Sequence, residues 1–228
     1  MSAPSPSGPD DKIAIGEAVR ARLLAHPAAM RLPTDRLDIF IVRDILDDAL
    51  RAGLIRLIDA RRAPSQLLAP AADPDFRTSE SCDLDPAEPL VREVEAKIRA
   101  ITGIAATHGE NIQGQRYAVG QQFKPHHDFF FTDQPYWEEM ERSGGQRTWT
   151  AMIFLNVPEG GGQTAFPDLD LRIAPRAGNL LIWNNMNAHG LPNPHSLHQG
   201  MPVTAGVKYV ITKWHRERPW GSWSAPTY

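Results

Sequence analysis

The segment 124–131 places two imidazoles and a carboxylate beside a run of aromatic side chains, in the sequence KPHHDFFF. Residues two apart on a β-strand point to the same side of the sheet, so His126 and Asp128 would lie together while His127 points away. Imidazole nitrogens and carboxylate oxygens are ligands of transition metals. We therefore interpret His126 and Asp128 as candidate metal ligands at the end of a core strand.

Two ligands on one strand need a third from elsewhere in the chain, and their spacing alone is weak evidence. The same His-x-carboxylate pattern also occurs at His108-x-Glu110 and His215-x-Glu217. Downstream histidines that could complete a site are His189, His195 and His198. Two histidines and one carboxylate would form the facial triad of non-haem Fe(II) oxygenases, which leaves coordination positions open. An ordinary polar strand end is the alternative.

Lys208 is the second unusual residue, because it lies in the largely apolar segment 201–214, which has the composition of a core strand. A buried ammonium group costs free energy unless it finds a partner. A ligand that carries a carboxylate would supply one. The alternative is that Lys208 lies on the solvent face of a half-exposed strand.

The elements that must position these residues begin with helices. Apolar residues at helical spacing predict helices over 12–30 and 46–61, with a short strand at 37–42 between them. A third helix is predicted to open at 85–88, DPAE, because this segment combines an acid suited to the N-cap, a proline and a second acid three residues later. Gly103 is expected to end this helix.

From residue 111 onward, short apolar runs alternate with clusters of Gly, Pro, Asn and Asp. Many short strands with such turns are typical of an antiparallel sandwich or barrel rather than a parallel α/β sheet. The glycines 160–162 are expected to form a tight turn between two strands. The predicted class is therefore α+β, with helices first and an antiparallel β core after them.

We expect one domain rather than two, because neither a linker nor an internal repeat is visible. Residues 1–11 hold almost nothing that could be buried, which predicts a disordered tail. The remaining residues, 12–228, are expected to form a single domain. Within this domain, 12–103 would supply helical support and 111–216 the β core.

The composition limits which partners are expected. The net charge is −3 with acidic and basic residues well mixed, so no surface for nucleic acid or an anionic membrane is expected. The single cysteine, Cys82, excludes an intramolecular disulfide and suits a reducing compartment. The sequence shows neither the apolar core of a signal peptide nor an apolar run that could span a membrane, so we expect a cytoplasmic protein.

Four segments carry a series of motifs: GENIQGQRYAVGQQFKPHHDF, GGQRTWTAMIFLNVPEGGGQTAFP, IAPRAGNLLIW and SLHQGMPVTAGVKYVITKW. In order they contain His-x-Asp, GGxTxFP, Pro-x-x-Gly and His-x-Gly-x-Pro-Val-x-x-Gly-x-Lys, and the series is far more specific than any single motif. With this series, more than half of the chain resembles the prolyl 4-hydroxylase branch of the Fe(II)/2-oxoglutarate-dependent dioxygenases. The resemblance implies a double-stranded β-helix, or jelly-roll, with the N-terminal helices packed on one sheet.

The resemblance also implies roles for individual residues. The iron ligands and catalytic centre would be His126, Asp128 and His198. Residues that match contacts to 2-oxoglutarate are Tyr117, Thr164 and Lys208, with Lys208 receiving the distal carboxylate. Residues that match the substrate side are Arg77, Arg147 and Trp214. The alternatives are core packing for Tyr117 and Trp214, turn chemistry for Thr164, and solvated surface charges for the two arginines.

The implied cofactor is Fe(II), with 2-oxoglutarate and O2 as cosubstrates and ascorbate as a reductant. The implied reaction hydroxylates a proline in a peptide or protein and forms succinate and CO2. A free amino acid or other small molecule is an alternative substrate, and a metal-holding jelly-roll module without catalysis is an alternative of another class. The segment 132–145 is expected to act as a lid over the substrate. The oligomeric state does not follow from the sequence.

Overall fold

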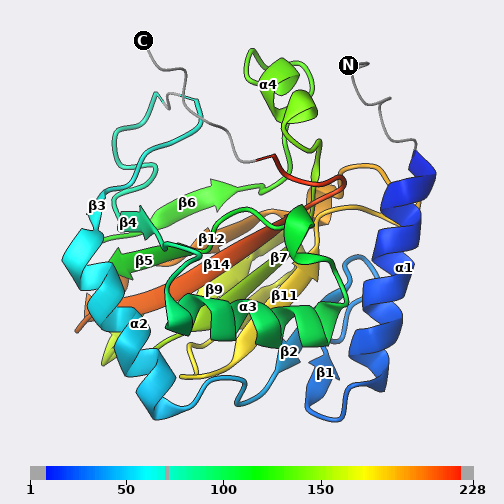
Figure 1. The fold of residues 1–228 in the computed structure, drawn as a ribbon. Coiled ribbons are helices and arrows are strands. Elements are labelled where there is room, and N and C mark those ends of the chain that lie inside the picture. Colours follow the sequence, from blue (N-terminus) through cyan, green and yellow to red (C-terminus); the bar gives the residue numbers. More distant parts are fainter. Residues whose placement is uncertain (1–8, 70–71, 222–228) are drawn as a thin grey trace.

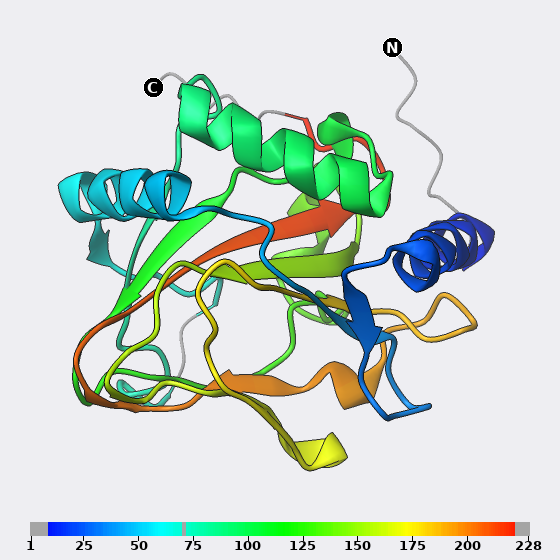
Figure 2. The same cartoon turned by 90° about the horizontal axis from the view of Figure 1, so that it is seen from below.

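The computed structural model describes residues 9–69 and 72–221, in which helices cover the larger of two main antiparallel sheets (Figure 1). The helices are α1 (Pro9–Ala25), α2 (Asp48–Arg61), α3 (Pro89–Thr102) and α4 (Trp137–Arg142). Short 3-10 helices span Ala106–His108, Pro167–Leu169 and Pro194–Ser196. Helices α1, α2 and α3 lie on the outer face of the larger sheet, and the smaller sheet lies on its other side (Figure 2). The predicted α+β class is confirmed.

The larger sheet contains eight strands in the order β1-β2-β11-β7-β14-β5-β4-β3. Their bounds are Ala29–Arg31 (β1), Ile39–Val42 (β2), Leu180–Asn184 (β11), Arg147–Phe154 (β7), Lys208–Arg216 (β14), Gln113–Tyr117 (β5), Glu80–Asp83 (β4) and Ala63–Pro64 (β3). The segment 12–103, expected to supply helical support, therefore also provides the strands at both edges of this sheet. Strand β4 has the polar sequence ESCD, which gave no strand signal.

The smaller sheet has four strands in the order β10-β9-β12-β6. Their bounds are Leu171–Ile173 (β10), Thr164–Phe166 (β9), His198–Gly200 (β12) and Phe123–His126 (β6). A separate pair joins β8 (Gly160–Gly161) to β13 (Val203–Ala205). Gly161 has φ 71°, and a Cβ there would lie 2.3 Å from the carbonyl oxygen of Pro202, so this position requires glycine.

Side chains on the central strands alternate between two cores. On β7, Trp149 and Ile153 pack beneath the helices, whereas Met152 and Phe154 face the smaller sheet. The same alternation separates Ile182 from its neighbours Leu181 and Trp183 on β11. Burying a large apolar side chain contributes roughly 1.5–3 kcal/mol to the free energy of unfolding. Because their side chains alternate in this way, the same strands stabilise both cores. Polar residues at the inward positions therefore lie between the sheets.

The first helix differs from the prediction at both ends. It begins at Pro9, so residues 9–11 belong to it rather than to the predicted tail, and residues 1–8 lie outside the described residues. It ends at Ala25 instead of continuing to residue 30. The reason is Pro27, which disfavours helical backbone at the residue before it. The segment that follows forms β1 at the edge of the larger sheet.

The third helix begins three residues later than predicted, at Pro89 instead of Pro86. Residues 85–88 form a turn, in which the backbone N–H of Glu88 donates to the carbonyl oxygen of Asp85 at 3.0 Å. Pro89 is the first helical residue, and Glu88 occupies the N-cap. Gly103 ends the helix in the left-handed conformation, with φ 75°, as predicted. Among the described residues, each helix is too short or too polar to cross a lipid bilayer.

Candidate functional site

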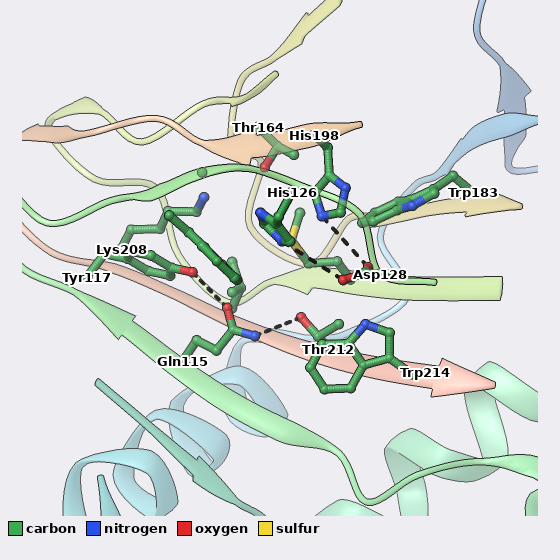
Figure 3. A pocket seen from close by; sticks show the side chains of 14 residues that line it. Gln115, Tyr117, His126, Asp128, Thr164, Trp183, His198, Lys208, Thr212 and Trp214 are labelled. Atoms are coloured by element: carbon green, nitrogen blue, oxygen red, sulfur yellow. Dashed lines mark hydrogen bonds and ion pairs between the residues drawn. The ribbon is translucent and has the colours of Figure 1, made fainter. Parts of the chain in front are cut away.

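The predicted metal ligands meet between the two sheets because of the strand register in the smaller sheet. Strand β6 ends at His126, strand β12 begins at His198, and these residues are paired across the antiparallel β6–β12 ladder. Asp128 follows two residues after the end of β6. Figure 3 shows the three side chains converging above the inner face of the larger sheet.

The ligand atoms of His126, Asp128 and His198 all lie within 4.8 Å of one another. Nε2 of His126 is 3.9 Å from Oδ1 of Asp128, and Nε2 of His198 is 3.7 Å from Oδ2. Nδ1 of His126 lies 2.8 Å from the carbonyl oxygen of Lys124, and Nδ1 of His198 lies 2.9 Å from that of Ser196. A carbonyl oxygen only accepts, so each Nδ1 carries the proton and each Nε2 presents a lone pair.

Burial and the neighbouring groups together shift the pKa values of His126 and Asp128. It lowers the pKa of His126 from 6.5 to about 3, with His198 as the next cause, so this imidazole is neutral near pH 7. Burial opposes ionisation of Asp128, but the imidazoles of His198 and His126, the charge of Arg147 and a hydrogen bond from Thr150 outweigh it and lower its pKa. Imidazole nitrogens with one carboxylate are a donor set that fits Fe(II).

The other histidines near this strand lie outside the cluster. Nε2 of His127 is 3.1 Å from the carbonyl oxygen of Pro194, to which it can donate a hydrogen bond. Nδ1 of His195 is 3.9 Å from a carboxylate oxygen of Asp168. Within the described part of the chain, His198 is therefore the one downstream histidine that joins His126 and Asp128.

Lys208 enters the same space from the opposite sheet (Figure 3). Its side chain is 2% exposed and makes no hydrogen bond or ion pair with any described residue. Nζ lies 5.3 Å from the ring centroid of Tyr117 and 5.7 Å from that of Phe154. Burial lowers the pKa of Lys208 from 10.5 to about 7. A buried amine without a carboxylate partner is ready to receive an anionic group.

Tyr117 and Thr164 line the cavity with Lys208. The hydroxyl of Tyr117 donates to Oε1 of Gln115 at 2.8 Å, and burial raises the pKa of Tyr117, which keeps it protonated. Oγ1 of Thr164 is buried and has no hydrogen-bond partner among the described residues. Both hydroxyls could therefore contact a ligand, although Tyr117 would first have to leave Gln115.

The cavity is narrow. The space that water can enter measures about 30 Å³, within about 400 Å³ of free space that includes the open mouth. That space has room for only a few water molecules. The donor set fits a metal ion, and the space beside it is small for a five-carbon diacid.

Seven lining residues were not among the predicted site residues, and three of these carry a polar side-chain group: Gln115, Trp183 and Thr212. Nε2 of Gln115 donates to Oγ1 of Thr212 at 3.3 Å, which joins β5 to β14 on the cavity side. Strand alternation could have found two of them, because Gln115 is two residues from Tyr117 and Thr212 is an even number of residues from Lys208. Trp183 gave no signal that distinguished it from a core residue.

The three residues predicted for the substrate side divide into two groups. Trp214 lines the cavity, whereas Arg77 and Arg147 are not among the lining residues. The guanidinium of Arg147 lies 4.0 Å from the ring centroid of Trp214 and donates two hydrogen bonds of 2.6 Å to Glu110. Arg77 donates to Oε1 of Gln113 at 2.7 Å. Both guanidinium groups are therefore engaged within the protein.

The segment 132–145, predicted to act as a lid, contains α4. Nη2 of Arg216 donates to the carbonyl oxygen of Met140 at 2.8 Å, and Nη2 of Arg218 donates to that of Glu141. The C-terminal part of the segment is thus fastened to the residues at and after the end of β14. Its action as a lid stays a prediction.

Comparison with known families supports the interpretation of the cluster. Residues 112–216 match the family model of the 2OG-Fe(II) oxygenase superfamily, and this range contains β5 to β14 and the three clustered residues. This match identifies residues 112–216 as a 2OG-Fe(II) oxygenase domain. A domain of this family implies Fe(II) and 2-oxoglutarate. The residues described above offer an N,N,O donor set for the metal and a buried amine for a carboxylate.

Curated relatives of this chain are prolyl 4-hydroxylases. It is 29% identical over 183 residues to a candidate prolyl 4-hydroxylase of Acanthamoeba polyphaga mimivirus, covering 78% of this chain and 74% of the relative. It is 29% identical over 206 residues to prolyl 4-hydroxylase subunit alpha-1 of Rattus norvegicus. That match covers 86% of this chain and 38% of the relative, so the chain spans well under half of that subunit.

Solved structures show the same architecture. The viral collagen prolyl hydroxylase of Paramecium bursaria Chlorella virus-1, in complex with 2-oxoglutarate, has a TM-score of 0.63 at 25% identity, covering 78% of this chain and 95% of that one. A prolyl hydroxylase of Trichoplax adhaerens in complex with a hypoxia-inducible-factor peptide has a TM-score of 0.61 at 14% identity, covering 91% of each chain, which supports the fold alone. The predicted jelly-roll fold and the predicted resemblance are confirmed.

Proposed function

We propose that this 2OG-Fe(II) oxygenase hydroxylates a proline in a peptide or protein and forms succinate and CO2 as co-products. The observation that carries the proposal is the meeting of the cluster of His126, Asp128 and His198 with the buried Lys208 in one cavity. A metal-binding group alone would fit many proteins. A metal-binding group beside a buried amine without a partner fits an enzyme that binds an anionic cosubstrate at the metal.

The three clustered residues would hold Fe(II) through Nε2 of each histidine and the carboxylate of Asp128. Bound Fe(II) supplies the oxygen chemistry, in which O2 is used to decarboxylate 2-oxoglutarate and hydroxylate a substrate C–H bond. Asp128 offsets one of the two metal charges, and a neutral imidazole offsets none. The remaining positive charge favours binding of the carboxylate of an oxo acid at this end of the cavity.

Lys208 would receive the far carboxylate of 2-oxoglutarate. A charge-assisted hydrogen bond of this kind is worth roughly 1.5–3 kcal/mol, which is enough to select a diacid over a monoacid. Because burial lowers the pKa of Lys208 to about 7, part of the free protein carries a neutral amine and takes up a proton when the diacid binds. The free hydroxyl of Thr164 would donate to the same carboxylate, and Tyr117 would do so after leaving Gln115.

Trp214 would form the wall against which the substrate packs. Its ring lies against the guanidinium of Arg147, which is itself held by Glu110, so the wall is rigid. A proline ring is compact and apolar and suits contact with an aromatic face. The relatives named as prolyl 4-hydroxylases support this substrate class. Arg77 would act indirectly, since its partner Gln113 also accepts a hydrogen bond from Gln115 in the cavity wall.

A free amino acid or other small metabolite is the second candidate substrate. The small enclosed space of the cavity favours it, because little room lies beyond the metal cluster and Lys208. A metal-holding module without catalysis is a weaker candidate. Such a module gains nothing from a buried amine that costs folding free energy.

Ascorbate, as a reductant that sustains turnover, and a cytoplasmic location also belong to the proposal. Cys82 is a free, partly buried cysteine, which suits a reducing compartment. The ascorbate requirement would be tested by omitting it from the assay, where we expect turnover to decline with time instead of continuing at a constant rate.

The test is succinate release under air with Fe(II), 2-oxoglutarate and a set of proline-containing peptides, each paired with a variant peptide in which alanine replaces proline. We expect stimulation by a proline peptide only, together with a mass gain of one oxygen atom on that peptide. Trp214→Leu should raise the KM for the peptide and leave 2-oxoglutarate turnover without peptide unchanged. Stimulation by a metabolite alone would favour the second candidate, and metal binding without turnover would favour the module.

A further inference from the structure

Two hydrogen bonds lead from Asp128 away from the metal cluster and into the larger sheet. Oγ1 of Thr150 lies 2.8 Å from Oδ2 of Asp128, and Nδ2 of Asn185 lies 2.9 Å from Oγ1 of Thr150. Thr150 and Asn185 are both 0% exposed. Among the described residues, Thr150 provides the only hydrogen bond to the Asp128 side chain besides its contacts with the clustered imidazoles.

The chemistry of the three groups fixes the direction of both bonds. An ionised carboxylate only accepts, so the single hydroxyl proton of Thr150 must point to Asp128. That hydroxyl can then only accept from Asn185, which must present its amide N–H rather than its carbonyl oxygen. The chain therefore runs in one direction, with Asn185 donating to Thr150 and Thr150 donating to Asp128.

The backbone holds both residues rigidly. Thr150 lies within β7 and is paired with Trp183 of β11. Asn185 follows the end of β11, where its N–H donates to the carbonyl oxygen of Thr148 at 2.7 Å and its own carbonyl oxygen accepts from the N–H of Asn193 at 2.8 Å. Asp128, in contrast, lies just beyond the end of β6. The Asp128 side chain is thus tied to Thr150 on the buried strand β7 and, through it, to Asn185 directly after β11.

We propose that Thr150 and Asn185 are positioning residues of the metal site. Their hydrogen bonds hold the carboxylate of Asp128 in one orientation and occupy one of its oxygens, so that the carboxylate meets the metal through the other. This inference rests on the proposed function to the extent that Asp128 is a metal ligand. It assigns roles to two residues that touch neither metal nor substrate and that carried no functional signal in the sequence.

The consequence is a loss of metal affinity when the hydroxyl is removed. Loss of an outer partner of a metal ligand typically lowers affinity 10- to 100-fold. Thr150→Val keeps the shape of the side chain and removes the hydroxyl, so we expect a loss of about this size. Thr150→Ser keeps the hydroxyl, so its affinity should stay within about threefold of the wild type.

The probe is Co(II) added to the full chain, with affinity measured by competition against a chelator and coordination followed by the visible absorption of the bound ion. Thr148→Val is the matched control. Thr148 lies on the same strand, is 1% exposed and donates to the carbonyl oxygen of His215 instead of to Asp128. It should keep both the affinity and the Co(II) spectrum of the wild type, whereas Thr150→Val should change both.

The outcomes separate this inference from the proposed function. Wild-type affinity and spectrum in Thr150→Val would overturn the inference while leaving the metal site intact. Failure of the wild-type protein to bind Co(II) would overturn the proposed function as well. If Thr150→Val does not fold, as judged by circular dichroism, Asn185→Leu decides, because it leaves Thr150 in place without its donor. A loss in Asn185→Leu supports the inference, and an unchanged affinity overturns it.

Discussion

Replacing Lys208 with methionine should stabilise the protein and weaken its hold on 2-oxoglutarate. Lys208 is 2% exposed, lies between the rings of Tyr117 and Phe154, and makes no hydrogen bond or ion pair with the described residues. Methionine has nearly the same length and no charge to desolvate. Lys208→Met therefore removes the cost of desolvating an ammonium group, which in the wild type only a bound anionic ligand would offset.

The size of this cost follows from the pKa of Lys208, which burial lowers from 10.5 to about 7. A shift of one pKa unit corresponds to 1.36 kcal/mol. Keeping the buried amine charged therefore lowers the free energy of unfolding by about 5 kcal/mol below pH 7. Above pH 7 the folded protein loses the proton while the unfolded chain keeps it, so the cost shrinks and disappears above about pH 10.5. The stabilisation by Lys208→Met should follow the same pH course and raise Tm by roughly 10 °C at pH 6.

Although Lys208→Met should stabilise the protein, it should lower the affinity for 2-oxoglutarate. Loss of a charge-assisted hydrogen bond worth roughly 1.5–3 kcal/mol should raise the Kd for 2-oxoglutarate about 10- to 150-fold. Wild-type affinity should also weaken above pH 7, by up to about tenfold per pH unit, because only the protonated amine pairs with the carboxylate. In Lys208→Met this pH dependence should be absent.

The assay combines thermal unfolding at pH 6, 8 and 10 with calorimetric titration of 2-oxoglutarate into protein loaded with Mn(II). Lys213→Met is the matched control, because Lys213 is also buried on β14 but is paired with Glu95 of α3. This control should lose stability and keep its affinity for 2-oxoglutarate. A Lys208→Met protein less stable than the wild type at pH 6, or one with unchanged affinity, would refute the reasoning.

Two further predictions concern the layers around the site. Arg147→Met breaks the paired hydrogen bonds to the partly buried Glu110 and should lower the unfolding free energy by about 3 kcal/mol in urea denaturation. An unchanged midpoint would show that the hydrogen bond from Arg216 is enough to satisfy Glu110. Gly114→Ala would place a Cβ 2.4 Å from Cγ1 of Ile58 in α2 and should cost about 1–3 kcal/mol without changing metal affinity. Unchanged thermal stability in Gly114→Ala would contradict the close packing of β5 beneath α2.

Much of the fold could be predicted from local patterns. Apolar spacing indicated α1 and α2, the residues 37–42 indicated β2, and the punctuated apolar runs after residue 111 indicated the antiparallel core. The errors arose where one residue overrides the pattern. Pro27 ends α1 early, and Pro89 rather than Pro86 opens α3. Strand β4 could not be predicted, because its polar side chains depend on pairing with β3 and β5 rather than on their own periodicity.

The candidate site was predictable where residues carry a chemical type at a characteristic spacing. That holds for His126 and Asp128, and for Lys208 within an apolar strand. The preference for His198 over His195 required the motif series, because both residues are histidines and residue type alone does not separate them. Thr150 and Asn185 could not be found, since a threonine in a strand and an asparagine after one are ordinary in any core. Their contact with the site depends on the packing of β7 and β11 beneath β6.

The most direct test of the site is an anaerobic titration of Fe(II) and 2-oxoglutarate, followed through the visible charge-transfer band of the chelate. It compares the wild type with His198→Ala and His195→Ala, two changes of the same kind only three positions apart. We predict one chelate per chain in the wild type and in His195→Ala, and no band in His198→Ala. A full band in His198→Ala would contradict the account.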